Sequence, residues 1–202
     1  MIQSNDRIFV GGKTGSGKTT LVKKVLWNQY TDRVFHDPKL TNSDLRTNAA
    51  LARDPETLEN LLSHGKRSIL YQPVDLGMED FDMVCSILFR RGNIVLFCDE
   101  AAAVCNPSFI TEEHRRLVTQ GRARGLGVVS CSQRTRDCHS LLLSETEHFF
   151  IFRLQLETDV AKLKKMIPPR DSELIYKLPR YHFIYFNPAE FDNVIPFAPL
   201  TV

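Results

Sequence analysis

One segment near the start of the chain, Gly12 to Thr19, matches the phosphate-binding pattern G-x-x-x-x-G-K-[ST]. The apolar run Ile8–Val10 before it predicts a strand, and Thr20–Gln29 after it predicts a helix. A glycine-rich loop between a strand and a helix holds phosphate oxygens with backbone N–H groups and with the positive end of the helix dipole. We therefore predict that Lys18 contacts the β- and γ-phosphates of ATP and that the Thr19 hydroxyl binds Mg²⁺. The predicted nucleotide-binding residues are Gly12, Lys13, Thr14, Gly15, Ser16, Gly17, Lys18, Thr19 and Thr20.

Predicted strands and helices alternate along the chain, which favours a three-layer α/β fold with a mostly parallel sheet flanked by helices. Most of the strands are continuous apolar runs, as expected where helices cover both faces of a sheet. Asp54 and Thr111 are predicted to cap two of the helices. Strands are predicted at Arg7–Val10, Arg33–His36, Ser68–Gln72, Ile94–Cys98, Gly127–Cys131, Phe149–Leu154 and His182–Phe186, and helices at Thr20–Gln29, 54–65, Met78–Arg91, 111–125 and Glu157–Ile167.

Length and composition fit one globular domain. The chain has 202 residues, of which 43% are apolar and 25% charged, so we expect a single domain over 1–202 with a proline-rich extended tail at 187–202. The net charge of +2 excludes a wholly basic surface, so any DNA contact requires a local patch. No apolar run approaches the ~20 residues of a membrane span. The five cysteines show no C-x-x-C spacing, which favours reduced, buried thiols over a metal site.

A second candidate catalytic element is the apolar strand that ends in Asp99 and Glu100. In P-loop nucleotide hydrolases an acid at this position holds Mg²⁺, often through water, and Asp99 fits that role. Glu100 can polarise the attacking water as a general base. Neighbouring residues at a strand end point in different directions, so one carboxylate can face the metal and the other the γ-phosphate. The alternative is that the two acids merely begin a loop.

Gln133 follows the next predicted strand. In a parallel sheet this strand can lie between the P-loop strand and the Asp99 strand, so that its end faces the γ-phosphate. A glutamine amide there can donate to the phosphate or orient water, and we therefore include Gln133 among the catalytic candidates. An ordinary polar loop residue is the alternative.

Four segments together resemble motifs of the FtsK–HerA branch of ring-forming DNA-pumping ATPases, from about Ile8 to Arg153. The resemblance implies an ASCE/RecA-like fold, ATP and Mg²⁺ as ligands, and ATP hydrolysis coupled to DNA translocation. One departure is Ser132, which stands where the family often has threonine and keeps the hydroxyl. The segments are Thr14-Gly15-Ser16-Gly17-Lys18-Thr19, His36-Asp37-Pro38-Lys39, Asp99-Glu100-Ala101, and Gly121 to Gly127 followed by Ser132-Gln133-Arg134.

Within this branch, a compact core without added domains is similar to the P9/A32-type genome-packaging ATPases of membrane-containing icosahedral DNA viruses. That resemblance implies a hexameric or pentameric ring around double-stranded DNA, capsid or portal proteins as partners, and a soluble protein in the host cytoplasm and at the packaging vertex. It also implies that an arginine of the neighbouring subunit approaches the γ-phosphate. We favour Arg122 for this role, with Arg124 and Arg153 as the other candidates.

A packaging motor must grip DNA of any sequence, so its contacts are expected to be to phosphates. Local basic clusters are the candidates, although a solvated helix or loop face is the favoured interpretation of each one, and the segment Ala101–Ile110 can line a pore. The aromatic side chains of Phe149, Phe150 and Phe152 are expected in the core. The basic clusters are Arg115-Arg116, Arg134 with Arg136, and Lys162 with Lys164-Lys165.

Two other functions remain open from the sequence. One is a small-molecule kinase of the nucleoside or nucleotide type, but a kinase must exclude water, so a water-activating Glu100 beside Asp99 argues against it. The other is a conjugation or phage-assembly motor of the same superfamily. DNA-stimulated hydrolysis or phosphate transfer to a nucleoside would separate the motors from the kinase.

Overall fold

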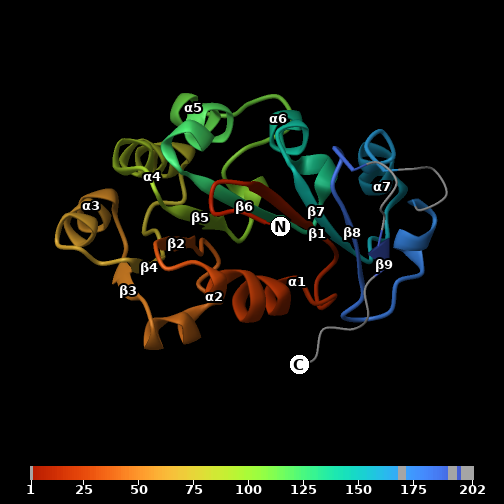
Figure 1. Ribbon diagram of the computed structural model, residues 1–202, viewed down its shortest axis with the longest axis horizontal. Coiled ribbons are helices and arrows are strands. Elements are labelled where there is room, and N and C mark those ends of the chain that lie inside the picture. Colours follow the sequence, from red (N-terminus) through yellow and green to blue (C-terminus); the bar gives the residue numbers. More distant parts are fainter. Residues whose placement is uncertain (1, 168–171, 191–194, 197–202) are drawn as a thin grey trace.

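The computed structural model describes residues 2–167, 172–190 and 195–196, and these form a nine-stranded sheet flanked by helices (Figure 1). The strand order is β3-β4-β2-β5-β6-β1-β7-β8-β9. The seven strands from β3 to β7 in this order are parallel, and β8 and β9 are antiparallel additions. The strands are β1 Arg7–Gly11, β2 Arg33–His36, β3 Ala50–Ala52, β4 Ser68–Tyr71, β5 Val95–Cys98, β6 Gly127–Ser132, β7 His148–Phe152, β8 Phe183–Phe186 and β9 Ile195–Pro196.

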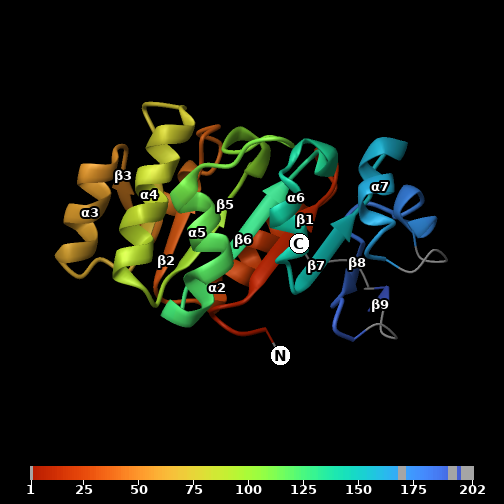
Figure 2. The ribbon, with the colours of Figure 1, turned by 90° about the horizontal axis from the view of Figure 1, so that it is seen from above.

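Helices cover both faces of the sheet. Figure 2 shows α4, α5 and α6 side by side over one face, with α3 and α7 toward its two ends, and Figure 1 places α1 and α2 on the opposite face. α1 and α2 are joined by a π-helical stretch at Leu21–Leu26. None of the described helices has the length and apolar character that crossing a membrane requires. The α-helices are α1 Lys18–Thr20, α2 Trp27–Gln29, α3 Pro55–Ser63, α4 Met78–Arg91, α5 Glu112–Gln120, α6 Ser140–Ser144 and α7 Glu157–Leu163.

Each sheet face has its own hydrophobic cluster, because strands buried on both sides send alternate residues to opposite faces. On the α1–α2 face, Trp27 packs edge-on against Phe35 and Phe97, with ring centroids 5.6 and 5.1 Å away. The larger cluster lies under α3 to α7 and includes Phe149. Phe149, Phe150 and Phe152 are buried, as predicted.

The strand order places the ends of β1, β5 and β6 next to one another. β6 lies between β5 and β1, as predicted, with Gly11 paired to Ser132 and Cys98 paired to Ser130. Because these strands are parallel, the segments that follow them all leave the same edge of the sheet. The P-loop, the acidic pair and Gln133 therefore start from one edge.

All seven predicted strands are confirmed, with ends that differ by at most two residues. The predicted helix over 111–125 ends at Gln120 and continues as a 3₁₀ turn, Gly121–Arg124, and the helix that begins at Glu157 ends at Leu163. Among the strands and α-helices of the described residues, β3, α6 and β9 were not predicted. β9 lies inside the predicted 187–202 tail, and residues 191–194 and 197–202 of that tail are outside the described residues.

Two helix starts show how capping is achieved. Oδ1 of Asp54 accepts a 2.8 Å hydrogen bond from the Thr57 N–H, as predicted for an N-cap. Thr111 occupies the N-cap position of α5 but makes no side-chain capping bond. Asp82 of α4 serves instead, because its Oδ1 accepts from the N–H groups of Glu113 and His114 at 2.9 and 3.1 Å. This cap comes from tertiary packing and leaves no local sequence signal.

Candidate active site

The P-loop is held on both sides by the strands next to β1. Gly12 N–H donates to the Ser132 carbonyl at 3.2 Å, and Lys13 N–H donates to the Arg153 carbonyl at 2.9 Å. Gly17 has φ +119°, and a Cβ at this position would lie 2.8 Å from Cδ1 of Tyr181. Only glycine combines this backbone conformation with this close approach.

Lys18 turns back onto its own loop. Its Nζ donates to the carbonyl oxygens of Gly12 at 2.6 Å and Lys13 at 3.2 Å. Burial lowers the pKa of Lys18, partly offset by the charges of Glu100 and Asp99. The Ser16 hydroxyl is buried and has no hydrogen-bond partner among the described residues. A buried ammonium and an unpaired buried hydroxyl in a glycine loop fit a phosphate group, which would satisfy both.

The acidic pair follows β5 directly, and its two members have different partners. Oδ2 of Asp99 accepts a 3.0 Å hydrogen bond from Nδ2 of Asn42, and burial raises the pKa of Asp99. Oε2 of Glu100 lies 2.5 Å from Nζ of Lys39, and its Oε1 lies 3.4 Å from the Ser132 hydroxyl. The two carboxylates therefore point in different directions, as the sequence suggested.

Gln133 lies beside the P-loop. The Thr14 hydroxyl donates to Oε1 of Gln133 at 2.7 Å, which joins the end of β6 to the loop after β1. The structure thus brings together the candidates Lys18, Glu100 and Gln133, along with Thr19 and Asp99. Glu100 and Gln133 follow the ends of β5 and β6, and Lys18 begins α1, after the loop that leaves β1.

A buried polar network lies behind Asp99; sequence reasoning named Asp37 only as part of the His36–Lys39 segment and did not predict its contacts. Asp37, fully buried after β2, accepts from the N–H groups of Thr41 and Asn42 at 3.2 and 2.9 Å and from Nε2 of Gln72 at 2.8 Å. Nδ2 of Asn42 bridges Asp37 and Asp99 at 3.0 Å each. The available signal was the position of Asp37 at the end of a buried strand, where parallel strands place their polar residues together.

The donors near the P-loop fit Mg²⁺. This cation prefers oxygen ligands and keeps several waters, so one hydroxyl, one carboxylate and phosphate oxygens suffice. Thr19 is exposed at the start of α1, and Asp99 supplies a carboxylate held by Asn42. No cluster of three or more His, Cys, Asp or Glu side chains able to hold a metal occurs among the described residues.

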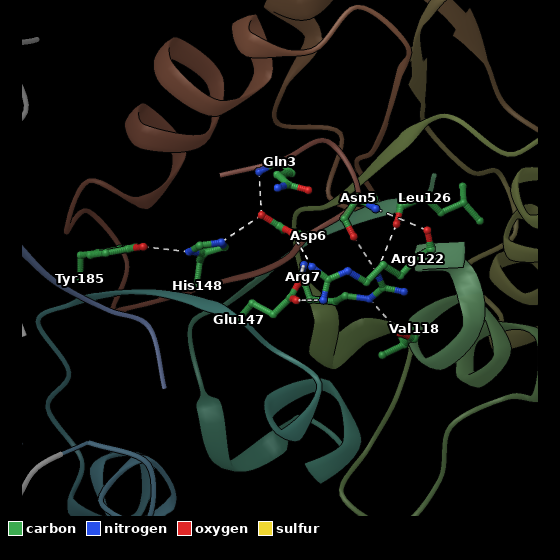
Figure 3. Close-up of polar contacts among 10 residues, drawn as sticks. All are labelled: Gln3, Asn5, Asp6, Arg7, Val118, Arg122, Leu126, Glu147, His148 and Tyr185. Atoms are coloured by element: carbon green, nitrogen blue, oxygen red, sulfur yellow. Dashed lines mark hydrogen bonds and ion pairs between the residues drawn. The ribbon is translucent and has the colours of Figure 1, made fainter. Parts of the chain in front are cut away.

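The three candidate arginines have different environments. Arg122 pairs with Glu147 and, at 3.4 Å, with Asp6, near the amino ends of β1 and β7 (Figure 3). Arg124 donates to the carbonyls of Phe89 and Arg90 at the end of α4, at 2.6 and 2.9 Å. The exposed side chain of Arg153 makes no hydrogen bond or ion pair with the residues that the structure describes, and its backbone touches the P-loop.

Behind Arg122 lies a buried chain of polar groups. Nε2 of His148 lies 3.0 Å from Oδ2 of Asp6, and its Nδ1 lies 2.8 Å from the hydroxyl of Tyr185 (Figure 3). Asp6 and His148 are both buried. Asp6 therefore links the exposed guanidinium of Arg122 to the sheet interior.

Several members of the predicted basic clusters are neutralised by nearby acids. Arg116 pairs with Glu113 at 3.3 Å, Arg134 with Asp159 at 3.2 Å, Arg136 with Asp137 at 3.0 Å, and Lys164 with Glu173 at 3.5 Å. Nζ of Lys162 lies 3.4 Å from the carbonyl of Arg136. Arg115 and Lys162 both help lower the pKa of His139, after burial, so each charge lies within electrostatic range of the His139 ring. The structure therefore brings residues of three separate clusters to one region around His139.

One contact of the P-loop comes from a distant part of the chain that sequence reasoning did not single out. Tyr181 N–H donates to the Ser16 carbonyl at 2.8 Å, and Nε of Arg180 donates to the Gly15 carbonyl at 3.2 Å. Tyr181 has φ +64°, an uncommon conformation for a residue with a side chain. No sequence pattern marked this segment, because its role depends on the position of β8 beside β7.

Comparison with known proteins gives consistent likenesses. No family model matches the sequence. The chain is 22% identical to the DNA packaging ATPase P9 of Enterobacteria phage PRD1 over 96% of this chain and 88% of that protein. Its fold matches the genome packaging NTPase B204 of Sulfolobus turreted icosahedral virus 2, in complex with ATP-gammaS, with a TM-score of 0.86 and 17% identity, covering 99% of this chain and 100% of that chain.

A more distant match is VirB4 of Thermoanaerobacter pseudethanolicus, with a TM-score of 0.68 and 10% identity over 97% of this chain and 89% of that chain. The solved structures show the fold, and the phage protein extends the likeness to sequence. The chain therefore has the P-loop ATPase fold and is similar, over almost its whole length, to the P9/A32-type viral packaging ATPases.

Proposed function

We propose that this protein is an ATP-hydrolysing motor that translocates double-stranded DNA and packages a viral genome into a preformed capsid. The observation that carries the proposal is the meeting of the Lys18 loop, the Asp99–Glu100 pair and Gln133 at one edge of the sheet. The printed function of the phage relative, DNA packaging, supports the choice of DNA as the substrate that is moved.

In the proposed reaction, backbone N–H groups of the P-loop and Lys18 bind the phosphates of ATP. Thr19 and Asp99 would hold Mg²⁺, which when bound neutralises charge on the β- and γ-phosphate oxygens. Glu100 accepts a proton from the attacking water, and Gln133 orients that water or the γ-phosphate. Burial of Lys18 and Asp99 strengthens these electrostatic interactions, because charges interact more strongly away from bulk water.

The proposal includes a ring in which Arg122 of one subunit serves the ATP site of its neighbour. Arg122 precedes β6, at the amino edge of the sheet, whereas its own P-loop lies at the carboxyl edge. This position, away from its own P-loop, supports a role for Arg122 at the site of a neighbouring subunit. Arg122 pairs with Glu147 and Asp6, and Arg124 donates to the carbonyls at the end of α4, so either side chain would have to leave these partners to reach a neighbouring site.

For the DNA contact we propose the basic region around His139, which includes Arg115, Lys162 and Arg136, the last of these paired with Asp137. These side chains come from α5, the 3₁₀ turn Thr135–Asp137 and α7, on the face opposite α1 and α2. The 3₁₀ turn begins two residues after Gln133, so a change at the γ-phosphate has a short covalent path to this region. The proposed place of action is the host cytoplasm and the packaging vertex, with capsid or portal proteins as partners.

The test is ATP hydrolysis by the purified protein with and without long linear duplex DNA, with Lys18→Ala as the inactive control. The proposal predicts hydrolysis that rises with added duplex, together with displacement of a triplex-forming strand from that duplex. Phosphate transfer to a nucleoside acceptor, without stimulation by DNA, would instead identify a kinase. A rate of ATP hydrolysis that does not change with duplex DNA of any length would contradict the proposed motor function.

A further inference from the structure

Glu100, the proposed general base, is engaged on both of its oxygens in this structure. Nζ of Lys39 lies 2.5 Å from Oε2, and the Ser132 hydroxyl lies 3.4 Å from Oε1. The close contact is the one with Lys39, which occupies Oε2 and fixes the direction in which the carboxylate faces. The ammonium therefore competes with the attacking water for Glu100, and its departure would open this oxygen to water.

The ion pair is asymmetric in its exposure. The side chain of Lys39 is 45% exposed, whereas that of Glu100 is 11% exposed. Because Lys39 is the half-exposed partner, its ammonium can turn toward water or another anion, but its departure costs free energy, since the buried Glu100 then loses its counter-charge. Glu100, in contrast, stays close to the end of β5 on which it is carried.

Lys39 sits on a loop whose backbone is held in place. Asp37 anchors the loop through the N–H groups of Thr41 and Asn42, and Leu40 has φ +56°. Because the backbone is fixed, movement of the Lys39 ammonium requires only side-chain rotation. Its charge lies within range of Lys18, where it contributes to lowering the pKa of that residue after burial. The ammonium is therefore near the proposed phosphate site.

We propose that Lys39 is a positioning residue that holds Glu100 until ATP binds, and that the γ-phosphate then draws the Lys39 ammonium away and frees Glu100 for water. The inference rests on the proposed function, since it requires a nucleotide in the P-loop. A terminal phosphate carries more negative charge than one carboxylate and offers several acceptor oxygens, so it outcompetes Glu100 for the ammonium. ADP lacks that group and leaves the pair closed.

The test is a binding cycle with ATPγS and ADP on the full chain, by calorimetry, in wild type, Lys39→Met, Glu100→Gln and the double variant. Methionine keeps the length of the side chain without its charge. We expect Lys39→Met to reduce the preference for ATPγS over ADP by roughly tenfold. Lys39→Gln should do the same, and Lys39→Arg should restore most of the preference. Lys66→Met, at an exposed site, is the matched control.

Glu100→Gln removes the competitor for the ammonium. It should strengthen ATPγS binding by about twofold to fivefold in wild type, and this gain should vanish in the Lys39→Met background. An equal gain in both backgrounds, or a Lys39→Met preference within twofold of wild type, would overturn the inference. Either result leaves the proposed function intact if wild-type hydrolysis still rises with duplex DNA. If the binding cycle gives the expected result but wild-type hydrolysis does not rise with duplex DNA, only the proposed function is contradicted.

Discussion

The hydroxyl of Thr14 donates a 2.7 Å hydrogen bond to Oε1 of Gln133, so the P-loop and the end of β6 are in direct contact. This bond orients the glutamine amide, because an oxygen that accepts from Thr14 leaves the NH₂ group free to donate elsewhere. The side-chain amide is therefore held at the edge of the nucleotide site while keeping a donor for phosphate or water.

Replacement of Gln133 by alanine removes this donor. We expect the kcat for ATP hydrolysis to fall by roughly hundredfold, with a much smaller effect on nucleotide affinity, because the amide acts on the γ-phosphate or the water. Thr14→Val is the matched control, since it removes the hydrogen bond and keeps the Gln133 amide. The decrease in kcat for Thr14→Val should be clearly smaller than that for Gln133→Ala. Steady-state kinetics with binding of ATPγS would check both. A Gln133→Ala enzyme with unchanged kcat would contradict the assignment.

Asn42 supplies the hydrogen bond that holds Asp99, and its loss should weaken the metal site. In Asn42→Ala the Mg²⁺ concentration for half-maximal hydrolysis should rise by roughly tenfold, since partners behind a ligand tune its affinity for metal. Asn48→Ala is the matched control, because Asn42 and Asn48 flank the 3₁₀ helix Ser43–Thr47 and Asn48 is exposed. A Mg²⁺ titration of both variants decides the matter. Equal Mg²⁺ requirements in wild type and Asn42→Ala would refute a role for Asn42 in the metal site.

If Arg122 acts on the neighbouring subunit, two inactive variants should rescue each other when mixed. Lys18→Ala cannot use its own site but still offers Arg122, and Arg122→Ala retains its own P-loop. Mixed rings should recover DNA-stimulated hydrolysis that neither variant shows alone. An arginine that a neighbouring subunit supplies to the γ-phosphate increases the rate of hydrolysis by on the order of 10³ or more. Arg124→Ala and Arg153→Ala serve as comparisons. Full activity of Arg122→Ala by itself would transfer the role to Arg153.

The burial of two histidines predicts that the folded protein is less stable at acidic pH. Burial lowers the pKa of His36 to about 3 and that of His114 to about 4, although Asp37 and Asp82 respectively oppose the shift. In the unfolded chain the two histidines bind protons near pH 6.5, whereas in the folded chain they stay neutral at that pH. Their contribution to the free energy of unfolding is therefore complete above pH 6.5 and is lost as the pH falls below it. The free energy of unfolding should then decrease by about 1.4 kcal/mol per pH unit for each histidine.

Urea unfolding between pH 7.5 and 5 measures this slope. His36 lies between Tyr71 and Phe81, with ring centroids 5.8 and 4.7 Å away, so His36→Phe replaces one ring with another. The variant should lose about half of the histidine contribution to the slope. An unchanged slope would show that His36 does not stay neutral in the folded protein.

The sheet was predictable because its central strands are continuous apolar runs bounded by turn-forming residues. β3 was missed because Ala50–Ala52 is only three residues long and forms through pairing with β4. α6 has five residues, too few for helical periodicity to register. The cap of α5 by Asp82 depends on the packing of α4 against α5, which no local pattern encodes.

In the candidate site, too, residues marked by a local sequence pattern were predictable, and contacts that depend on packing were not. Asp99, Glu100 and Gln133 follow strand ends that a parallel topology brings together, and Lys18 follows the loop that leaves β1, so motif and strand order were enough to predict their common location. The partners of these residues were not predictable in the same way. Lys39 reaches Glu100 from 61 residues away in sequence, and Arg180 reaches the P-loop from 165 away. Such contacts arise only once the loops after β2 and before β8 have packed.

The substitution Glu100→Gln tests most directly whether the P-loop and the acidic pair form one hydrolytic site. The change keeps the size and polarity of the side chain and removes its ability to accept a proton. ATPγS binding should persist or strengthen, while kcat for DNA-stimulated hydrolysis should fall by roughly 10²–10⁴-fold. Turnover by Glu100→Gln at the wild-type rate would contradict the account, because water would then be activated by some other group.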